Sequence, residues 1–566
     1  MADFSQNNSP IQLMLPLAPD TLLATRLTGW EELNRGYHLT VEALAKKGTR
    51  IPFGHLLGQP GTVLVTVAGW ADRYFTGVVF SIQKKRADND FDHYTLVIRP
   101  ALDRLAHTQR TRLFQDQSAL EIIHQLLQPV GGMENRVSRL VPLRTYCAQY
   151  RETDLEFFLR LCSEEGFSFY WRHQGPWTEK VDDREVHHPA SAILVLTDNT
   201  TLVEPEMTIR FDPQGGGTKN DGPRFTEWEC GQELGATSVE IRDSHFQLAG
   251  MALTGRAGTP SLRLGGEEPL KFPEAPGPWQ QDNHSQARFV DGVTPSGAPS
   301  QNPPVAGVLD EMQRSAAGRL MEGVVGHCVR SLGAGYCPQL AAGLGFTLTN
   351  CGDEDGPHVA TRVEHRVEMR GRFFAGEASQ LELETRVRAV PQKVPQSPWP
   401  PIPKPNVGGL HTAEVVDGNS GQEVHLDPYG RVRVRFPWDR EEGSAGTWVR
   451  VAQIWAGNGW GAVFWPRVGH EVVVAFEGGD PDRPLIVGSV YNSKNMPPYE
   501  LPKQAYSSGI KSCSKDGNPK DNYSHIVFQD DGKPPMLAIH SEGWVTNTQK
   551  KDLVQIRPKL DISITG

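Results

Sequence analysis

Short runs in which hydrophobic and polar residues alternate dominate the first hundred positions of the chain. The runs over 37–43, 62–67, 75–83 and 93–98 are rich in β-branched and aromatic residues and are separated by Gly, Pro, Asn and Asp. A period of two residues is typical of half-buried strands, and the separating residues favour turns. The pattern predicts a β-barrel or a strongly curved sheet at the start of the chain.

Two helical segments interrupt the strands. Apolar residues recur at helical spacing over 118–127, behind Asp116 or Ser118 as the expected cap. A capping-box pattern at residues 153–156 opens a second amphipathic run, which Gly166 ends. We expect the first helix to pack on the sheet, and the second, which leads directly into a strand, fits α+β packing.

The middle of the chain is harder to interpret. Pro, Gly and acidic residues interrupt every candidate strand over 174–300, so the fold of this stretch stays open. Beyond it, apolar spacing predicts a helix over about 310–321. Alternating runs then predict a second β-rich unit, with strands over 345–349, 358–366 and 381–390.

A proline-rich stretch marks the clearest boundary. Pro occupies seven of the fifteen positions from 391 to 405, which predicts an extended, semi-rigid connector. Seven short runs at hairpin spacing follow, and they predict a small closed barrel of the OB type, because closure removes unpaired strand edges. These runs are 410–417, 423–426, 431–436, 448–454, 461–465, 471–476 and 486–491.

The last part of the chain consists of short alternating strands with no helix and little bulky apolar content. We predict strands over 524–528, 536–540, 553–556 and 560–564. So few residues cannot close a core of their own, and exposed strand edges invite pairing with other chains. The pattern therefore predicts that several copies wind together.

The barrel contains the most distinctive charge pattern. Over 431–436 basic and hydrophobic residues alternate, which places Arg431, Arg433 and Arg435 on the face opposite the apolar residues. We predict that this face forms intersubunit or interdomain ion pairs. Single-stranded nucleic acid, which OB barrels often bind, and a solvated face are the alternatives.

Composition narrows the function classes. The chain has 57 basic and 67 acidic residues and a net charge of −10, which argues against a protein whose main task is to hold nucleic acid. No apolar run approaches the roughly 18 residues that span a bilayer, and the first residues lack the pattern of an export signal. The 7 Cys include no CxxC pair, so we interpret them as buried thiols.

Candidate metal sites are weak. His470 is followed by Glu471 as in a metalloprotease motif, but the second His four residues on is missing. His187 and His188 have no further ligand at short spacing and are interpreted as part of a loop. The spacing of Cys328, Cys337 and Cys351 is irregular for zinc.

The sequence evidence for catalytic groups is equally weak. We interpret the adjacent Glu164 and Glu165 as solvated surface and the glycine-rich stretch 457–461 as a hairpin turn. We therefore assign no catalytic, cofactor-binding or metal-ligating residue, and predict that the protein is not an enzyme.

Several segments resemble the VgrG spike proteins of type VI secretion systems. The resemblance covers about residues 20 to 545 and is most specific in the barrel, where residues 427–434 read Asp-Pro-Tyr-Gly-Arg-Val-Arg-Val. Further matching segments are 36–41, 74–79, 112–116, 149–158, 448–451, 455–457, 466–472 and 478–484.

The resemblance implies a homotrimer like the hub and spike of a contractile phage tail. Its fold class would be mainly β with a few inserted helices (α+β): duplicated β-barrel hub domains, an OB-fold barrel and a short trimeric β-helical or β-prism needle. The implied domains are a first hub unit, a second hub unit, a Pro-rich linker, the OB barrel and the start of the intertwined needle. Their bounds are 1–173, 174–390, 391–409, 410–495 and 496–566.

The resemblance also implies partners and a location. An Hcp tube ring and baseplate components would contact the base, and a PAAR-repeat tip protein or effectors would dock at the needle end, near Ile562, Ile564 and Gly566. Assembly would take place in the cytoplasm, before secretion without a signal peptide into a target cell or the medium. Contact with the target membrane would be transient, and neither a cofactor nor nucleic acid is implied.

Two alternatives stay open. A spike of a contractile phage tail or of an extracellular injection particle would have the same architecture. A peptidoglycan hydrolase acting during cell-wall crossing is the alternative of another class, although no acid–base pair supports it. Many family members carry a longer needle, and some carry an added enzymatic domain, for which this chain has no room.

Overall fold

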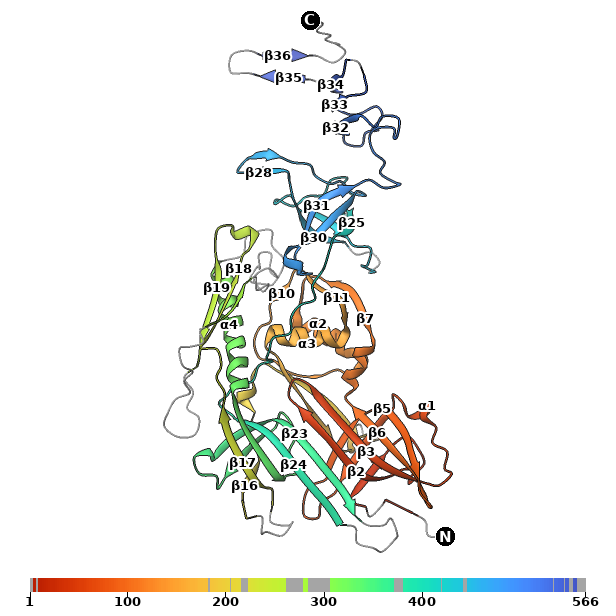
Figure 1. Ribbon diagram of the computed structural model, residues 1–566, viewed down its shortest axis with the longest axis vertical. Helices are drawn as coiled ribbons and strands as arrows, with labels where there is room; N and C mark the ends of the chain where they lie inside the picture. The colour runs from red at the N-terminus through yellow and green to blue at the C-terminus, as the bar shows by residue number, and fades with distance from the viewer. Residues whose placement is uncertain are drawn as a thin grey trace. The chain divides into compact units, whose positions relative to one another are not determined.

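The computed structural model divides the chain into two units, Met1–Pro405 and Asn406–Gly566 (Figure 1). The predicted strand over 560–564, with Ile562, Ile564 and Gly566, lies outside the described residues. The structure describes residues 4–6, 9–181, 184–203, 205–214, 222–260, 278–282, 306–370, 380–418, 420–440, 445–532, 534–543, 545–548 and 553–556.

Twelve strands of the first unit pair into one sheet. In spatial order they are β1 (Ile11–Met14), β4 (Pro60–Val65), β5 (Arg73–Ala87), β6 (Phe91–Arg99), β3 (Gly36–Lys46), β2 (Leu23–Glu32), β23 (Gly356–Arg370), β22 (Gly345–Thr349), β16 (Pro205–Phe211), β17 (Arg224–Gln232), β21 (Val329–Tyr336) and β24 (Gln380–Pro391). Because β23 also pairs with β24, the last six strands form a closed ring. The antiparallel pair β2–β23 joins this ring to the first six strands.

The alternation in the sequence sets which side chains form the core. In β6, Tyr94, Leu96 and Ile98 are buried, whereas the residues between them are partly exposed. The same period holds in β3, where Leu39 and Val41 are fully buried and Glu42 is exposed. The predicted strands of the first hundred residues are therefore confirmed.

Both predicted helices are present, as α2 (Ala119–Leu127) and α3 (Asp154–Glu165); each begins with a capping box, of which only the one at Thr153 was predicted. The Ser118 hydroxyl accepts a hydrogen bond from the backbone N–H of Glu121, at 3.2 Å, so Ser118 rather than Asp116 is the cap. Gly166, at φ 68°, ends α3 in the left-handed conformation that glycine favours.

A third long helix, α4 (Ala306–Cys328), exceeds its predicted range of 310–321 at both ends. It packs on a small sheet of β18 (Ser238–Asp243), β19 (Leu253–Gly258) and β20 (Pro278–Asp282), in the stretch that the sequence left open. At Gly255 a side chain would meet the backbone oxygen of Gln313 at 2.1 Å, so glycine permits this close approach.

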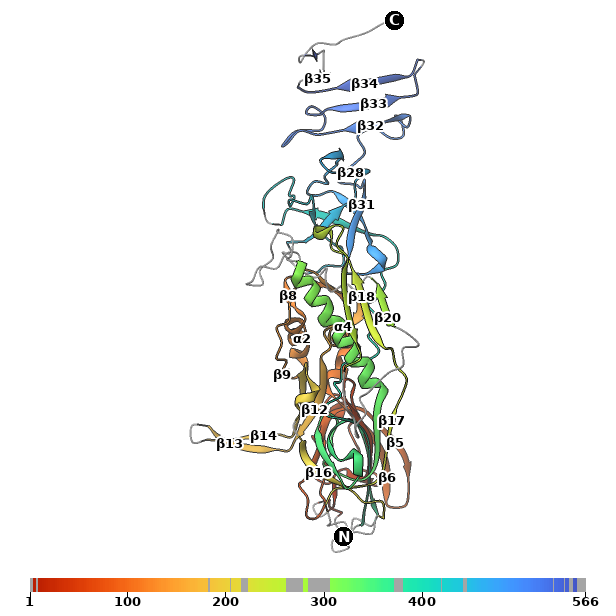
Figure 2. The same ribbon diagram turned by 90° about the vertical axis from the view of Figure 1, so that its left-hand side faces the viewer.

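Smaller elements complete the first unit. Figure 2 shows the hairpin of β13 and β14 projecting from the rest of this unit. The short elements are α1 (Phe53–Leu56), β7 (Gln109–Phe114), β8 (Gln117–Ser118), β9 (Glu134–Arg136), β10 (Leu143–Arg144), β11 (Cys147–Thr153), β12 (Ser168–Gln174), β13 (Trp177–Val181), β14 (Arg184–His188) and β15 (Ser191–Thr197).

The proline-rich stretch lies along the first unit. Val394 is buried, the Ser168 hydroxyl donates to the Gln396 carbonyl at 2.8 Å, and the Ile402 N–H donates to the Ser163 hydroxyl at 2.9 Å. These contacts hold the stretch against the segment around α3. The division into five parts stays a prediction.

The second unit contains the predicted closed barrel. Its strands pair in the order β25 (His411–Val416), β26 (Val432–Arg435), β27 (Thr447–Val451), β31 (Pro484–Val490) and β30 (Glu471–Phe476). The predicted strand over 423–426 is wrong, because Glu423 lies in a loop where its carboxylate binds Arg467 at 2.7 Å and accepts the Asp516 N–H at 3.2 Å.

Two groups of strands lie outside the barrel in this unit. A hairpin of β28 (Trp455–Gly457) and β29 (Trp460–Ala462) confirms the turn predicted at 457–461. The tail contains the three-stranded sheet of β32 (Ser507–Lys511), β33 (His525–Gln529) and β34 (Met536–His540), followed by β35 (Val545–Thr548) and β36 (Leu553–Ile556). The predicted fold class, mainly β with a few inserted helices and an OB barrel, is confirmed.

Candidate interaction surface

One face of the tail sheet is apolar and exposed. Directly opposed residues of antiparallel strands point to the same face, so Ile510, Ile526 and Ile539 form one row across the sheet. Phe528 and Leu537 extend this row, and we call these five residues the apolar rows. Their exposed fractions are 56% for Ile510, 45% for Ile526, 65% for Ile539, 48% for Phe528 and 57% for Leu537.

The centre of the opposite face of the same sheet is covered by the chain itself. Val527, which lies between Gly509 and Ala538, is only 2% exposed. A side chain at Gly509 would meet the Tyr499 hydroxyl at 2.8 Å, so the segment before β32 crosses this face. The centre of this second face is therefore packed within the chain, whereas the apolar rows are exposed.

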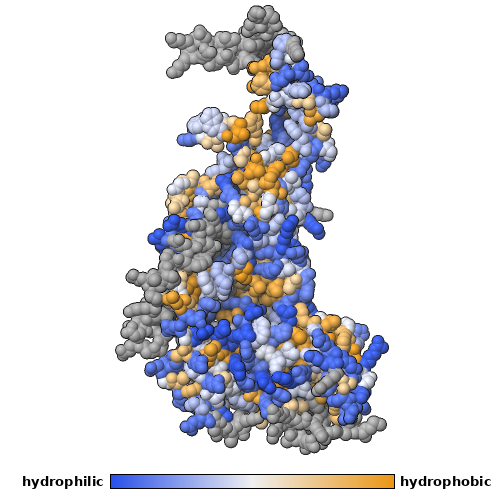
Figure 3. Space-filling view, in the orientation of Figure 1, coloured by the Kyte–Doolittle hydropathy of each residue, from blue (hydrophilic) through white to orange (hydrophobic). Residues whose placement is uncertain are grey.

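The β28–β29 hairpin is a second exposed apolar region. Trp455 and Trp460 are 62% and 59% exposed, and their rings meet edge to face with centroids 5.0 Å apart. Ile454, Val463 and Phe464 beside them are 85%, 59% and 52% exposed. Hydrophobic side chains reach the surface of this unit in the space-filling view (Figure 3). Apolar clusters of this kind mark surfaces that bind other proteins.

The three predicted arginines of the barrel have partners within the barrel. Arg431 is buried and its Nε lies 2.6 Å from Asp427, and the guanidinium of Arg433 lies 4.9 Å from the ring of Trp448. Arg435 is more exposed and lies 3.3 Å from Glu414. Intersubunit or interdomain pairing of these arginines stays a prediction. The alternation that placed them opposite the core is confirmed, because Val432, Val434 and Phe436 are buried.

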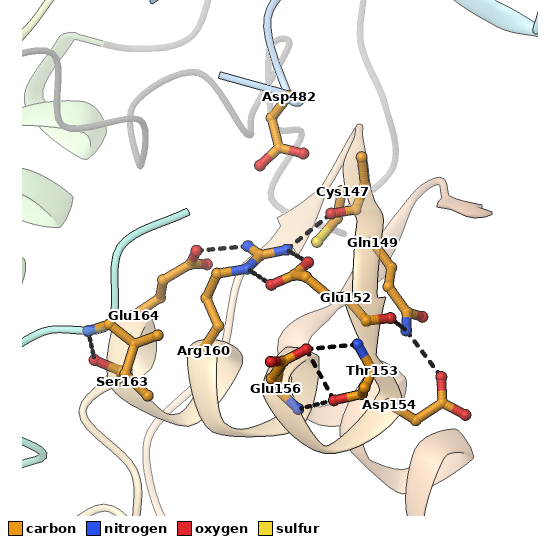
Figure 4. A network of polar contacts seen from close by, with 12 residues as sticks. Cys147, Gln149, Glu152, Thr153, Asp154, Glu156, Arg160, Ser163, Glu164 and Asp482 are labelled. Carbon is orange, nitrogen blue, oxygen red and sulfur yellow. Dashed lines mark hydrogen bonds and ion pairs between the residues drawn. The ribbon is translucent and has the colours of Figure 1, made fainter. Parts of the chain in front are cut away.

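Arg160 forms the centre of a buried charge cluster in the first unit (Figure 4). Its side chain is fully buried in α3 and binds both oxygens of Glu152, at 2.7 and 2.8 Å. Its Nη1 lies 2.7 Å from the Glu164 carboxylate, and its Nη2 also donates a hydrogen bond to the Ala148 carbonyl at 2.8 Å. Bidentate pairing of this kind fixes the orientation of both groups.

Arg144 extends this cluster to the end of α3. It is 1% exposed and lies 2.6 Å from Glu164 and 2.7 Å from Glu165. Burial raises the pKa of Glu164, but the adjacent Arg160 and Arg144 outweigh it and hold the pKa well below its usual range. The interpretation of Glu164 and Glu165 as solvated surface is therefore wrong, because packing of α3 buries both carboxylates against arginines.

A second buried charge cluster lies among the strands of the first unit. Glu31 of β2 binds Arg73 of β5 at 2.6 Å, and the imidazoles of His173 and His365 lie 4.0 and 3.6 Å from the same oxygen. Burial opposes the charge on Glu31, yet Arg73 and the two histidines lower its pKa to about 2. Burial lowers the pKa of His173 to about 4, so its imidazole is neutral near pH 7.

Sequence patterns gave no sign of these clusters, because arginine and glutamate occur throughout the chain and their partners meet only through tertiary packing. In both clusters arginine holds the carboxylates, so removal of one partner would leave a buried charge unpaired. No group of three or more His, Cys, Asp or Glu residues within the described part of the chain could hold a metal ion.

Other sequence interpretations need correction. His187 and His188 belong to strand β14 rather than a loop, and the ring of His188 stacks on Trp177 with centroids 4.0 Å apart. Four of the cysteines are buried as predicted, but Cys351 and Cys513 are only partly buried and Cys230 is exposed. Among the described helices, none is long and apolar enough to cross a membrane.

Comparison with known proteins matches two stretches of the chain to two families. Residues 30–371 match the family described as phage tail baseplate hub (GPD). Residues 415–491 match the type VI secretion system/phage-baseplate injector OB domain.

Individual proteins give the same picture. The chain is similar to the type VI secretion system spike protein VgrG1c of Pseudomonas aeruginosa, with 31% identity over 95% of this chain and 69% of that protein. It is similar to VgrG1a of the same organism, with 31% identity over 96% of this chain and 78% of that protein.

Among solved structures, the fold resembles that of the E. coli c3393 protein, described as a component of the type VI secretion system with structural similarity to the T4 bacteriophage tail proteins gp27 and gp5. The TM-score is 0.53 at 17% identity, over 85% of this chain and 100% of that chain.

Proposed function

The chain belongs to the VgrG spike proteins of the type VI secretion system, and from that premise we propose that it is one subunit of a homotrimeric puncturing spike. In this role it caps the tube of Hcp rings and carries a PAAR-repeat tip protein or effectors into target cells. The spike assembles in the cytoplasm on baseplate components and is then secreted, touching the target membrane only transiently.

The single observation that supports a trimer best is the contrast between the two faces of the tail sheet. A three-stranded sheet needs one face packed to be stable in water. The chain itself covers Val527 on one face, whereas the apolar rows on the other are 45% to 65% exposed. Three identical sheets that turn these rows toward a common axis would bury them without leaving any copy exposed.

The experiment for the trimer compares substitutions at neighbouring positions of β33. Phe528→Asp places a charge in the apolar rows, whereas Gln529→Asp places the same charge on the opposite face. Light scattering of the wild type and of Gln529→Asp should give three times the chain mass of 62.6 kDa, and Phe528→Asp should give the mass of one chain. A wild type that stays monomeric at micromolar concentration contradicts the trimer.

The delivery role needs a cellular test. In a strain that lacks its own spike protein, the full chain should restore release of Hcp into the medium, and Phe528→Asp should not. Restoration by Phe528→Asp would separate delivery from assembly and contradict the proposed mechanism.

We also infer that the role is structural rather than enzymatic. The buried carboxylates Glu152, Glu164 and Glu165 are all held by arginines, so none is free to act as a general acid or base. Zymography of the purified chain on peptidoglycan tests this inference, and a cleared band that persists on repurification would contradict it.

A further inference from the structure

The face of the tail sheet opposite the apolar rows carries two histidines side by side. His525 of β33 and His540 of β34 are directly opposed in the antiparallel register, and the centroids of their rings lie 5.6 Å apart. The ring of Tyr523 lies 4.7 Å from that of His540 and 5.2 Å from that of His525. Since His525 is partly exposed and His540 is exposed, the pair is open to solvent.

The chemistry of this pair suits a metal ion. Neutral imidazole is a ligand for zinc, copper and nickel, and a ligand must lose its proton before it binds. His525 and His540 are directly opposed on neighbouring strands, with ring centroids 5.6 Å apart, so each can present a nitrogen to one ion between them.

Two charged groups modulate the site. The Lys511 ammonium lies 4.0 Å from the ring of Tyr523 and repels a cation. Glu542 lies two residues beyond His540, and its carboxylate accepts hydrogen bonds from Ser514 and Asn522, each 2.7 Å. A carboxylate at this end of the sheet attracts a cation.

We propose that His525 and His540 form a two-ligand site for a divalent transition-metal ion, with water in the remaining positions. The ion would join β33 to β34 on the face opposite the apolar rows. Two protein ligands give a weaker and more exchangeable site than the four of structural zinc sites. The site lies within one chain, so it depends on neither the trimer nor the delivery role.

Calorimetric titration of the full chain with Ni²⁺ tests the site, together with equilibrium dialysis to count the ions. The wild type should bind one more ion per chain than either His525→Gln or His540→Gln, whose affinity at this site should fall at least tenfold. Because one imidazole cannot chelate, the double variant should lose no more affinity for Ni²⁺ at this site than either single variant.

The matched control is His187→Gln, which removes an exposed strand histidine from the first unit. This variant should bind as many ions per chain as the wild type. Lys511→Met should tighten binding, because it removes the nearby positive charge. Equal binding by the wild type and by both single variants would overturn the proposal.

A second measurement uses the unaltered chain, in case a variant fails to fold. Bound Ni²⁺ should slow hydrogen exchange of the amides in β33 and β34 while leaving the barrel strands unchanged, because a ligand that binds only the folded sheet suppresses its opening. Unchanged exchange in both strands would contradict the site.

Discussion

The first unit and the tail sheet differ in how their least favourably placed side chains, buried charges and exposed apolar groups, are paired. The first unit buries Arg144 and Arg160 completely and satisfies them with glutamates of the same unit. The tail sheet leaves five large apolar side chains of the apolar rows at the surface. The first unit thus contains the partners that its buried charges need, whereas the chain by itself leaves the apolar rows of the tail exposed. Folding and assembly should therefore respond to different substitutions.

The largest effect is expected from breaking the buried cluster around Arg160. Arg160→Ala leaves Glu152 and Glu164 charged, and loss of one partner from a buried ion pair costs about 3–5 kcal/mol. Hydrogen exchange of the α3 amides measures this loss as local unfolding. The control Arg136→Ala removes an exposed pair with Glu134 and should cost less than about 1 kcal/mol. Equal effects of both substitutions would contradict a structural role for the cluster.

Acid should weaken the first unit through its second charge cluster. His173 is buried as a neutral group with a pKa of about 4, so below its ordinary value of 6.5 the unfolded chain binds a proton that the folded chain does not. Stability therefore falls as the pH drops from about 6.5 to about 4, by up to about 3 kcal/mol at 1.4 kcal/mol per pH unit.

Glu31 adds to this loss at lower pH. Its folded pKa of about 2 is below its ordinary 4.5, so its stabilisation is present above about 4.5 and is lost as the pH falls toward about 2. Unfolding of the wild type and of His173→Gln at a series of pH values measures both steps. The variant should lose the dependence between pH 6.5 and 4, and an unchanged profile would contradict the assignment to His173.

A smaller effect, on assembly alone, is expected at the β28–β29 hairpin. Trp460 is 59% exposed, so Trp460→Ala should leave the barrel's stability almost unchanged. If the hairpin lies at a subunit contact, loss of this ring should cost about 2 kcal/mol of association, or roughly a 30-fold weaker trimer. Sedimentation at a series of concentrations measures it.

The control for the hairpin is Trp438→Ala, which should lower the stability of the barrel instead of weakening association. Trp438 stacks on the buried Phe436 with ring centroids 4.6 Å apart, so Trp438→Ala should destabilise the barrel itself. A Trp460→Ala variant that unfolds like Trp438→Ala would show that the hairpin supports the fold rather than assembly.

The parts of the fold that could be predicted from the sequence are those set by residues close together in the chain. The capping box at Thr153 depends on residues three positions apart, so the pattern alone predicts the start of α3. The same holds for the barrel strand at Val432, where alternation separates core from surface.

Features that depend on distant contacts could not be predicted. Arg144 meets Glu164 only because α3 packs against the preceding strands, and nothing in the spacing of the two residues indicates burial. His525 and His540 are fifteen positions apart and meet through strand register. The tail has little bulky apolar content, yet five large apolar side chains share one face of its short sheet, because strand register brings them together.

The smallest effect, and the one that tests the prediction made for the barrel arginines, is expected at Arg435. Its pair with Glu414 is exposed, with side chains 42% and 45% accessible, so Arg435→Ala should change the stability of the barrel by less than about 1 kcal/mol. Arg431 is buried against Asp427, and Arg431→Ala should cost several times more. A trimer that weakens in Arg435→Ala, with the barrel unchanged, would identify Arg435 as an intersubunit partner. An unchanged trimer would restrict its role to the pair within the barrel, because a charge that bridges two subunits must affect their dissociation.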